Sequence, residues 1–376
     1  MKNYMMSFSR MRFFGMRFFG LISVLLLVTP MALAQDLVSE PDAESAGDEE
    51  TVLADPPDFV TLEISEWTVP WADTRPRDPD VAPNGSIWLV GQGGDYVARF
   101  DPESLEFERK PLPPGTGPHN LIVDRDASIW FAGNRQGYIG KMDPNSGKIR
   151  RFTMPDDALK DPHTLVFDHS GHIWFTAQWS NFIGRLNKRT GAVDLVSVPI
   201  AKARPYGIKL DSNGHPWVAL LGTNALATVD PATMELEVFH TPREKSRIRR
   251  IAITSDDMVW YTDYSEGYLG RFNPQTSEIS EWQNPSARSG PYAIAADKED
   301  HIWFVETWPE PNNFVGFDPA SETFFSETPI PSGAGAVRHM VFDEKTNSIW
   351  FGTDTNNLAQ AMMPEITYSS ESEPVP

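Results

Sequence analysis

The sequence contains no cysteine. This absence excludes disulfide bonds, thiolate nucleophiles, Cys-ligated metals and iron–sulfur clusters. A chain without cross-links has to be stabilised by the burial of apolar surface, which requires a large core. The sequence therefore predicts one large folded domain rather than a small disulfide-linked one.

Positive charge is also scarce, because 32 Lys and Arg face 52 Asp and Glu and give a formal net charge of -20. This balance argues against nucleic acid or an anionic membrane as a partner. Part of the negative charge lies in the polar segments 35–57 and 365–376, which contain few aromatic residues and are predicted to be flexible. The folded domain is therefore expected to occupy residues 58–364.

Long hydrophobic runs are missing as well, since the apolar run 21–28 is too short to span a bilayer permanently. Basic residues precede this run, and Ala32-Leu33-Ala34 follows it. This order predicts a cleaved signal peptide over residues 1–34, which would leave Gln35 at the new N-terminus. Because no Cys is present to take a lipid, we expect a soluble periplasmic or secreted protein with no membrane insertion.

An internal repeat indicates the fold. A short motif ending in Ile-Trp or Val-Trp, or a close variant of it, recurs at spacings of 42, 44, 43, 43, 43 and 47 residues. The seven tryptophans are Trp88, Trp130, Trp174, Trp217, Trp260, Trp303 and Trp350.

Each repeat divides into four short β-runs separated by turn residues. In the second repeat an apolar run at 121–123 precedes Ile-Trp-Phe, then Tyr-Ile-Gly-Lys-Met, the turn 143–147 and an alternating run at 148–152. Four strands in roughly 40 residues are typical of a propeller blade. With no helical periodicity, the sequence predicts an all-β, seven-bladed β-propeller whose repeated tryptophans pack between neighbouring sheets.

The seventh repeat lacks its fourth strand. Residues 63–70 (EISEWTVP) closely repeat residues 278–285 (EISEWQNP), which form the fourth strand of an earlier repeat. We therefore expect the N-terminal strand to complete the last blade and close the ring, which removes exposed sheet edges.

One position in the repeat is polar in all seven blades but differs in residue type. It lies eleven residues before each Trp, with one inserted residue before Trp350. Its occupants are Arg77, His119, His163, Tyr206, Arg249, Tyr292 and Arg338. The innermost strand of a blade borders the central channel, and a structural position would repeat one residue type. The variation therefore predicts a functional site at one mouth of the channel.

These residue types suggest proton transfer and anion binding. Arg binds carboxylate, phosphate or sulfate through forked hydrogen bonds. His119 and His163, on adjacent blades, can serve as general base and acid. Tyr292 or Tyr206 can transfer a proton if a nearby Arg lowers its pKa. The alternative is that channel arginines and carboxylates only neutralise each other and hold water.

The remaining histidines are not assigned to the site. His240 lies on an outer strand, and His339 lies beside the ring position. Four others fall in turns and are expected to be solvated: His169, His172, His215 and His301.

A second variable position lies three residues after each Trp and carries carboxylates only in blades five and six. Asp263 and Glu306 can hold a hard divalent cation through oxygen ligands. The sequence therefore predicts Mg²⁺ or Ca²⁺ as a possible cofactor and no organic cofactor.

The repeated phrase Pro-His-x-Ile/Leu, Gly-x-Ile-Trp-Phe-Thr, Ile-Gly-Arg-Leu and Thr-Gly resembles the streptogramin B lyases, the family of virginiamycin B lyase, over about residues 62 to 364. The resemblance implies a seven-bladed propeller that opens a cyclic depsipeptide by magnesium-dependent elimination. It also implies a Glu-x-His motif in a late blade and a second Glu fourteen residues after the His. The carboxylates would bind the metal, and the His would remove a proton.

Carried over by position, the resemblance places Glu306 at the second metal carboxylate. Tyr292 stands where the basic His is expected, and Gly290 stands where the first Glu is expected. One blade earlier, Arg249 replaces a substrate-binding His. In another repeat register, Asp161-Pro162-His163 imitates the acid-x-His motif, but Ala177 then occupies the second carboxylate position.

The residues and the resemblance together predict an exported lyase that acts by proton abstraction and elimination on an anionic substrate in the channel. The substrate would be a small molecule or an oligosaccharide- or peptide-like chain. The alternatives are a metal-dependent lactonase or hydrolase and a non-catalytic ligand- or protein-binding propeller. The sequence shows no oligomerisation seam and predicts a monomer.

The expected catalytic residues are His163, Tyr292 and His119; the substrate-binding residues are Arg77, Tyr206, Arg249 and Arg338; the metal ligands are Glu306 and Asp263.

Overall fold

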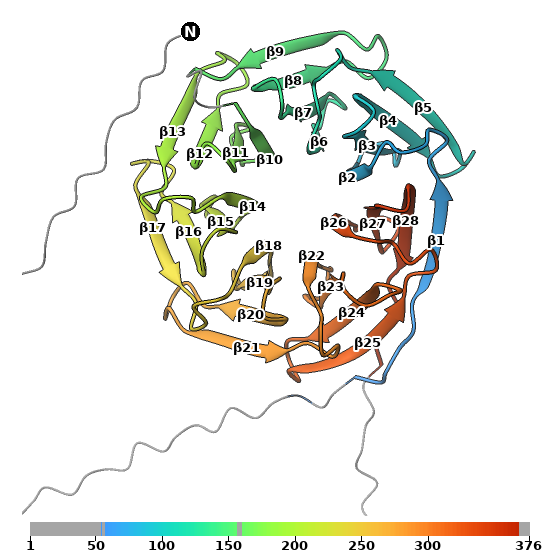
Figure 1. Cartoon of the computed structure of the whole chain (residues 1–376), viewed down its shortest axis with the longest axis vertical. Coiled ribbons are helices and arrows are strands. Elements are labelled where there is room, and N and C mark those ends of the chain that lie inside the picture. The colour runs from blue at the N-terminus through green and yellow to red at the C-terminus, as the bar shows by residue number, and fades with distance from the viewer. Residues whose placement is uncertain (1–53, 55–56, 156–159, 368–376) are drawn as a thin grey trace, which may run out of the picture. The chain divides into compact units, whose positions relative to one another are not determined.

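The computed structural model describes residues 54, 57–155 and 160–367. The predicted signal peptide 1–34, most of the predicted linker 35–57 and the tail beyond residue 367 lie outside these residues. Within them the chain forms 28 strands in seven four-stranded antiparallel sheets and no helix. The sheets stand side by side in a ring (Figure 1), so the predicted all-β, seven-bladed propeller is confirmed. The described part of the chain contains no helix long and apolar enough to cross a membrane.

Each blade contributes one strand to each of four concentric positions. The innermost strands are β2 (Pro76–Val81), β6 (Leu121–Val123), β10 (Pro162–Phe167), β14 (Pro205–Leu210), β18 (Ile248–Ile253), β22 (Pro291–Ala296) and β26 (Val337–Asp343). The second strands are β3 (Ile87–Gly91), β7 (Ile129–Gly133), β11 (Ile173–Ala177), β15 (Pro216–Leu220), β19 (Val259–Asp263), β23 (Ile302–Glu306) and β27 (Ser348–Thr353).

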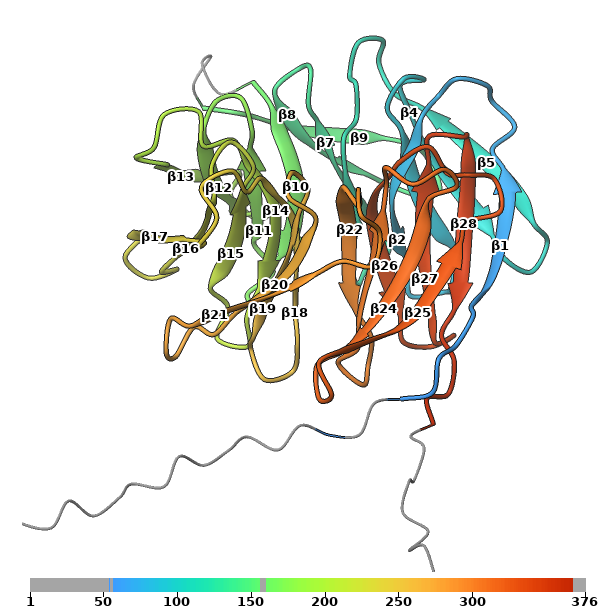
Figure 2. The same cartoon turned by 60° about the horizontal axis from the view of Figure 1, so that its bottom comes forward.

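The outer half of each blade is built in the same way. The third strands are β4 (Tyr96–Asp101), β8 (Tyr138–Met142), β12 (Phe182–Leu186), β16 (Ala225–Val229), β20 (Tyr268–Phe272), β24 (Asn313–Asp318) and β28 (Asn357–Met362). The outermost strands are β5 (Glu106–Pro111), β9 (Ile149–Thr153), β13 (Val193–Ser197), β17 (Leu236–His240), β21 (Ile279–Gln283), β25 (Thr323–Pro329) and β1 (Glu63–Thr68). The strands run between the two faces of the ring (Figure 2).

The repeated tryptophans form the core between blades, as predicted. All seven are buried, with exposed fractions of 3% or less. Trp130 of blade two packs with Leu165 and Phe175 of blade three, and Trp350 of blade seven packs with Ile87 and Phe100 of blade one. Each Trp therefore joins its own sheet to the next, so the core is a set of interfaces between neighbouring sheets.

The N-terminal strand closes the ring, as predicted. β1 pairs with β28 from Glu63↔Met362 to Thr68↔Asn357, and the sheet order of the last blade is β1-β28-β27-β26. Trp67 of β1 stacks on Trp350 at a ring-centroid distance of 5.5 Å. Trp282 stacks on Trp260 at the same distance in blade five, so the N-terminal strand takes over the role of an ordinary fourth strand.

Replacing Trp67 with Ala is expected to lower the free energy of unfolding by about 2 kcal/mol, because the half-buried indole loses its contacts with Trp350 and Phe100. Chemical denaturation measures this loss. Hydrogen exchange should show faster exchange of the β28 amides, since β1 holds their strand in place. Trp282→Ala is the matched control, with a similar loss of stability and unchanged exchange in β28. Equal β28 exchange in both variants would contradict the assigned closure.

A bulge near the start of the innermost strands positions the site. The pairing register with the second strand shifts between residues 77 and 80 in β2 and at the equivalent place in β10, β14, β18, β22 and β26. Asp78, at the bulge of β2, has a φ of 47°, a left-handed conformation that Asp tolerates better than most residues. Because strict alternation fails here, two successive side chains of one strand can serve the same end of the channel.

Candidate active site

The structure brings the histidines and tyrosines of the predicted ring into one continuous group at the channel mouth. The His119 and His163 rings lie 3.5 Å apart, and the His163 and Tyr206 rings lie 4.2 Å apart, between centroids. The Tyr206 and Tyr292 hydroxyls form a short hydrogen bond. All four side chains are buried. Four predicted site residues from blades two, three, four and six therefore make one contact chain.

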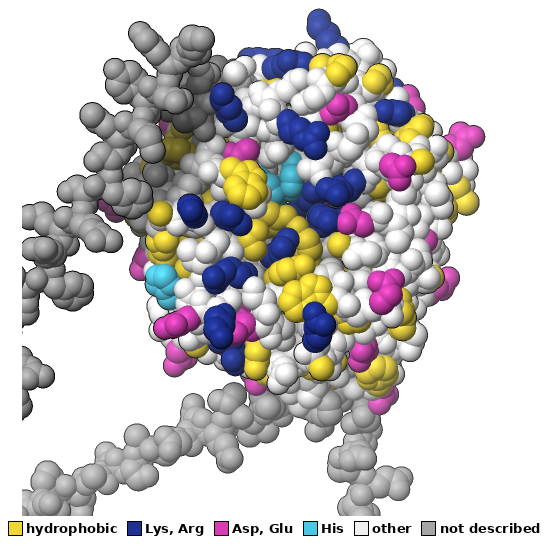
Figure 3. Space-filling view, viewed as in Figure 1, with side chains coloured by type: hydrophobic (Ala, Val, Ile, Leu, Met, Phe, Trp, Pro, Cys, Tyr) yellow, Lys and Arg dark blue, Asp and Glu magenta, His cyan; other side chains and the backbone are white. Residues whose placement is uncertain are grey.

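Arginines surround this group. The Arg249 guanidinium lies 4.4 Å from the Tyr292 ring centroid and 3.8 Å from that of Tyr264. The Arg338 guanidinium lies 6.0 Å from the Tyr292 ring centroid. Lys and Arg side chains gather around the central opening, and a His shows within it (Figure 3). The mouth is therefore cationic although the whole chain is strongly acidic.

The arginines differ in how many of their donors are already paired with side chains of the protein. Arg338 is ion-paired with Asp354. The Nε atom of Arg77 donates to Asp78 Oδ1 at 3.0 Å, and its Nη1 donates to Gln92 at 3.1 Å, but its buried Nη2 has no hydrogen-bond partner among the described residues. In the same described set, Arg249 has no ion-pair partner, and its buried Nε is unpaired. Arg249 and Arg77 therefore have donors free for an anionic ligand.

The sequence prediction missed the residues one position further along the innermost strands. Arg250 is buried and donates to Asp78 Oδ2 at 3.2 Å, to Thr164 Oγ1 at 3.1 Å and to the Arg338 carbonyl at 2.9 Å. Thr164 in turn hydrogen-bonds His163 Nδ1 at 2.8 Å. Asp78 and Arg250 thus link residues of blades one, three, five and seven next to the ring positions. The Arg249-Arg250 pair and the Asp78-Pro79 step were the only signals of this second layer.

The two tyrosines that share the hydrogen bond have pKa values shifted in opposite directions. Burial, and then the neighbouring Tyr292, raise the pKa of Tyr206 to about 12. Burial alone would also raise the pKa of Tyr292, but Arg249, Arg77, Arg250 and Arg338 outweigh it and lower that pKa below 10.0. Paired groups with divergent pKa values are typical of acid and base partners. Tyr292 is therefore the better base, and Tyr206 the better proton donor.

The two histidines are held neutral. Burial, and then the positive charges of Arg77 and Arg250, keep the pKa of His119 and of His163 well below 6.5. The His119 Nδ1 and His163 Nε2 atoms are buried without a hydrogen-bond partner in the described part of the chain. A buried polar atom without a partner is unfavourable unless a ligand or water satisfies it. Both atoms are therefore free to hydrogen-bond a ligand.

Asp263 and Glu306 contact the loops that connect blades. Asp263 accepts hydrogen bonds from Ser246 Oγ at 2.7 Å and from the Arg247 amide at 2.9 Å. Glu306 accepts bonds from the hydroxyl and the amide of Ser286. Both are fully buried, and the described residues contain no group of three or more acidic or His side chains that could hold a metal ion. The contacts of both carboxylates therefore support a role in holding the loops, and the Mg²⁺ or Ca²⁺ expected from the sequence stays a prediction.

His301 does not behave as expected for a turn residue. The expectation that it is solvated is wrong, because it is only 3% exposed and its Nδ1 lies 3.2 Å from Asp297 Oδ2. Burial lowers its pKa, but the hydrogen bond and the charge of Asp297 outweigh burial and raise it. His301 therefore supports the turn before β23 and lies apart from the ring.

Comparison with known proteins places the fold in a family. The model of the virginiamycin B lyase family matches residues 60–229 and 191–367. The structure of selenomethionine-substituted virginiamycin B lyase from Staphylococcus aureus is 23% identical, with a TM-score of 0.73, and the match covers 81% of this chain and 100% of that one.

Further structures share the architecture. A catalytically inactive His-to-Ala variant of the Staphylococcus aureus lyase with quinupristin is 22% identical, with a TM-score of 0.74 and coverage of 81% and 100%. The WD40 propeller domain of Doa1 is 12% identical, with a TM-score of 0.67 and coverage of 82% and 98%. A search of curated proteins found no match. The structural likenesses show the propeller fold, and the match of the family model over nearly the whole described region shows that this chain belongs to the virginiamycin B lyase family.

Proposed function

We propose that this protein is a lyase that removes the proton next to a carboxylate and expels an oxygen substituent from the neighbouring carbon. The observation that supports the proposal most is the direct hydrogen bond between Tyr206 and Tyr292 inside an arginine-lined mouth. This arrangement provides a base, an acid and an anion-binding wall within a few ångströms.

The substrate carboxylate would bind the free donors of Arg249 and Arg77. A forked, charge-assisted hydrogen bond to a guanidinium is strong, and neutralising the carboxylate makes the adjacent C–H more acidic. Arg250 is already engaged with Asp78 and Thr164, so it would hold the wall in place rather than contact the substrate. The negative charge that develops on the carboxylate during proton removal would therefore face two positive groups.

Tyr292 would act as the base in its deprotonated form. Its oxygen takes the proton, and the C–H electron pair becomes a carbon–carbon double bond while the bond to the leaving oxygen breaks. Tyr206, with a pKa of about 12, gives its proton to the leaving oxygen. The proton on Tyr292 can then return to Tyr206 along their shared hydrogen bond, which restores both groups.

The histidines would orient the substrate. Neutral imidazoles at His119 and His163 present one unpaired ring nitrogen each, which suits hydrogen bonds to sugar hydroxyls or a carbonyl. A uronic-acid sugar combines such hydroxyls with a carboxylate, an adjacent C–H and an oxygen leaving group. A uronate-type substrate therefore fits these groups best, and the proposed reaction uses only the side chains of this chain.

The proposal predicts an unsaturated acid as the product. Incubation of the protein with uronate oligomers should give a rise in ultraviolet absorbance, with and without EDTA, because no step requires a divalent cation. Quinupristin, the compound bound to the Staphylococcus aureus relative, provides the comparison substrate. Opening of quinupristin without any reaction of uronate oligomers would contradict the proposal. Complete loss of the reaction in EDTA would contradict the metal-free mechanism.

A further inference from the structure

A second cationic pocket adjoins the channel mouth between blades four and five. Its volume is about 440 Å³, and Lys202, Arg204, Arg247 and Arg249 supply four positive side chains without a lining carboxylate. Leu221, Gly222, Tyr264 and Ser265 complete the lining. Arg249 also lies against Tyr292, so the pocket and the ring share a wall. A ligand in the ring can therefore extend into this pocket without leaving the surface.

The positive charge of the pocket is not neutralised within the fold. Lys202, Arg204, Arg247 and Arg249 form no ion pair in the part of the chain that the structure describes. Within the described residues, the Arg247 side chain donates only to the backbone carbonyls of Glu244 and Ser246. Four like charges around one hollow repel each other, and the rest of the chain is acidic enough to have supplied partners. The arrangement is therefore suited to an external anion.

Arg204 precedes Pro205 in a left-handed conformation with a φ of 55°. The equivalent residues are Arg75 in blade one, with a φ of 50°, and Gly117 and Gly290 in blades two and six, with φ of 51° and 53°. Gly avoids the strain of this conformation, whereas Arg204 and Arg75 retain it. The conformation therefore belongs to this place in the blade, and the unpaired charge of the pocket, rather than its backbone, points to a ligand.

The pocket floor is shaped by a close backbone approach. The Gly222 amide donates to the Ala203 carbonyl at 2.7 Å, and a Cβ at position 222 would lie 1.9 Å from the Lys202 carbonyl oxygen. Only Gly fits at this place. The backbone that carries Lys202 and Arg204 is thereby held against the turn between β15 and β16, and both residues line the pocket.

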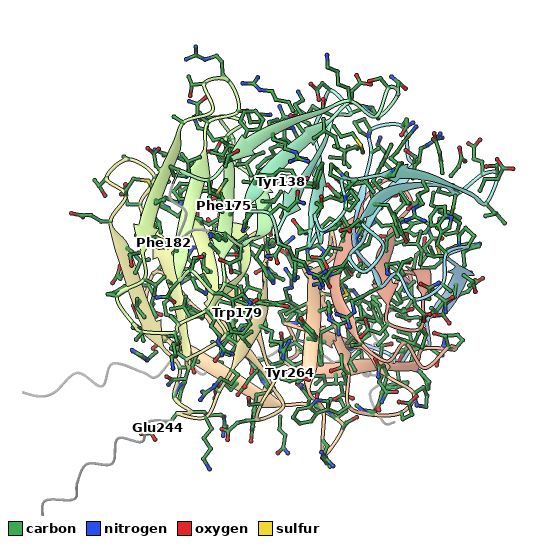
Figure 4. All side chains as sticks on the ribbon, turned by 45° about the horizontal axis from the view of Figure 1, so that its top comes forward. Tyr138, Phe175, Trp179, Phe182, Glu244 and Tyr264 are labelled. Carbon is green, nitrogen blue, oxygen red and sulfur yellow. The ribbon has the colours of Figure 1, made fainter. Side chains whose placement is uncertain are left out.

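Aromatic side chains accompany the cations of the pocket: Tyr264 lines it, and Trp179 contacts Arg204 (both labelled in Figure 4). Trp179, in the turn between β11 and β12, is 67% exposed, and the Arg204 guanidinium lies 4.5 Å from its ring centroid. Trp308 is 41% exposed and donates from Nε1 to the Tyr264 hydroxyl at 3.0 Å. Exposed flat rings next to cations suit a ligand with apolar ring faces and charged edges. An acidic sugar chain has both, whereas an acidic peptide lacks the ring faces.

We infer that this pocket is a subsite for a second carboxylate of an acidic oligosaccharide, adjacent to the unit bound in the channel. The inference rests on the proposed function for the position of the first unit. It narrows the substrate class from any uronate to a chain of at least two uronate units. Lys202 and Arg204 would bind the second carboxylate, Arg249 would lie between the two units, and Trp179 would stack on a sugar ring.

The test is a binding titration with a defined trigalacturonate, followed by calorimetry, on a Tyr292→Phe background that prevents turnover. The double variant Lys202→Gln and Arg204→Gln is expected to bind the trimer at least about tenfold more weakly, since charged hydrogen bonds are lost. The matched control is Lys148→Gln with Arg150→Gln on and beside β9, which makes the same charge change on an outer strand and should bind as the parent does.

Two ligands test the chemical class. The carboxyl-reduced trimer, which is neutral, should bind at least about tenfold more weakly than the acidic trimer. Oligoglutamate of similar charge should bind more weakly than the trimer. Absence of trimer binding, unchanged affinity of the pocket variant, equal binding of the reduced trimer, or tighter binding of oligoglutamate would each overturn the inference.

The outcomes separate the subsite from the proposed reaction. If the trimer binds through Lys202 and Arg204 but the protein with Tyr292 intact forms no unsaturated product, the subsite is correct and the proposed function is wrong. If the unsaturated product forms and the KM for the trimer is the same in the pocket variant as in the parent protein, the proposed reaction is correct and the subsite is wrong.

Discussion

Replacing Tyr292 with Phe is expected to lower kcat for uronate elimination by at least about 100-fold, the usual contribution of a positioned general base. The phenyl ring keeps the contacts with Arg249 and Arg338, so binding and folding should change little. The lost oxygen is the one that hydrogen-bonds Tyr206 and is stabilised as an anion by the surrounding arginines. Ultraviolet progress curves at saturating substrate measure the change.

The control is Tyr268→Phe, the same substitution on β20 of blade five, beneath the Arg243 guanidinium and outside the mouth. It should retain the rate of the parent protein. The parent rate should also rise with pH as Tyr292 loses its proton, with a midpoint below 10.0. Tyr292→Phe with an unchanged kcat, or a parent rate that is flat up to pH 10, would assign the base to another residue.

Acidification below pH 6.5 is expected to destabilise the fold by several kcal/mol. Burial, and then nearby cations, keep the pKa of His119 and His163 well below 6.5, and burial with Arg250 lowers that of His339 to about 3. Above pH 6.5 the three histidines are neutral in both the folded and the unfolded chain, so their protonation does not change the free energy of unfolding. Below pH 6.5 the unfolded chain binds protons at these histidines and the folded protein does not. Each histidine therefore costs about 1.4 kcal/mol per pH unit until its folded pKa is reached.

Two buried carboxylates, Asp80 and Asp78, determine how much of this loss in the free energy of unfolding is measured. Burial raises the pKa of Asp80 to about 6. As pH falls below 6, the folded protein takes up a proton at Asp80 and loses an unfavourable buried charge. This gain in stability cancels the loss caused by one of the three histidines. Arg77 and Arg250 outweigh burial and lower the pKa of Asp78, so its stabilisation is lost only in stronger acid, below its unfolded value near 3.8. Between pH 6 and 5 the net loss is therefore about 3 kcal/mol, from two histidines.

Denaturant titrations at pH 7.5, 6.5, 5.5 and 5.0 measure this dependence. The variant His339→Asn removes one of the three groups and should reduce the slope below pH 6.5 by about 1.4 kcal/mol per pH unit. A lysine substitution outside the channel, Lys298→Gln, should leave the slope unchanged. Equal stability at pH 7.5 and 5.0 would show that these histidines are protonated in the folded protein.

The fold could be predicted because its signal is periodic. Each buried Trp occupies the same place in every sheet, so the period gave the number of blades, and the repeated EISEW segment gave the closing strand. The ring residues could be predicted by the same counting. The structure then brought Tyr206 and Tyr292 together although they are 86 positions apart and belong to blades four and six.

The second layer of the site could not be predicted by counting. Asp78 and Arg250 should have pointed away from the channel if the strands had alternated strictly, and the bulge that turns them inward has no distinctive residue type. Asp263 and Glu306 illustrate the opposite problem. A carboxylate at the end of a strand serves equally well as a metal ligand and as an acceptor for a neighbouring loop, and only the contacts with Ser246 and Ser286 distinguish the two.

The pairing of β1 with β28 also governs when the protein can finish folding. Glu63 faces Met362, so the segment that leaves the ribosome first in the propeller has to wait for the segment that leaves last. Until then, blades two to six can form from local contacts, but the last blade lacks its outer strand and the first and last blades are not yet joined. Contacts this distant along the chain form slowly. Synthesis from the N-terminus would therefore leave the ring open until β28 is complete, and a chain that ends before residue 357 would lack the partner strand of β1.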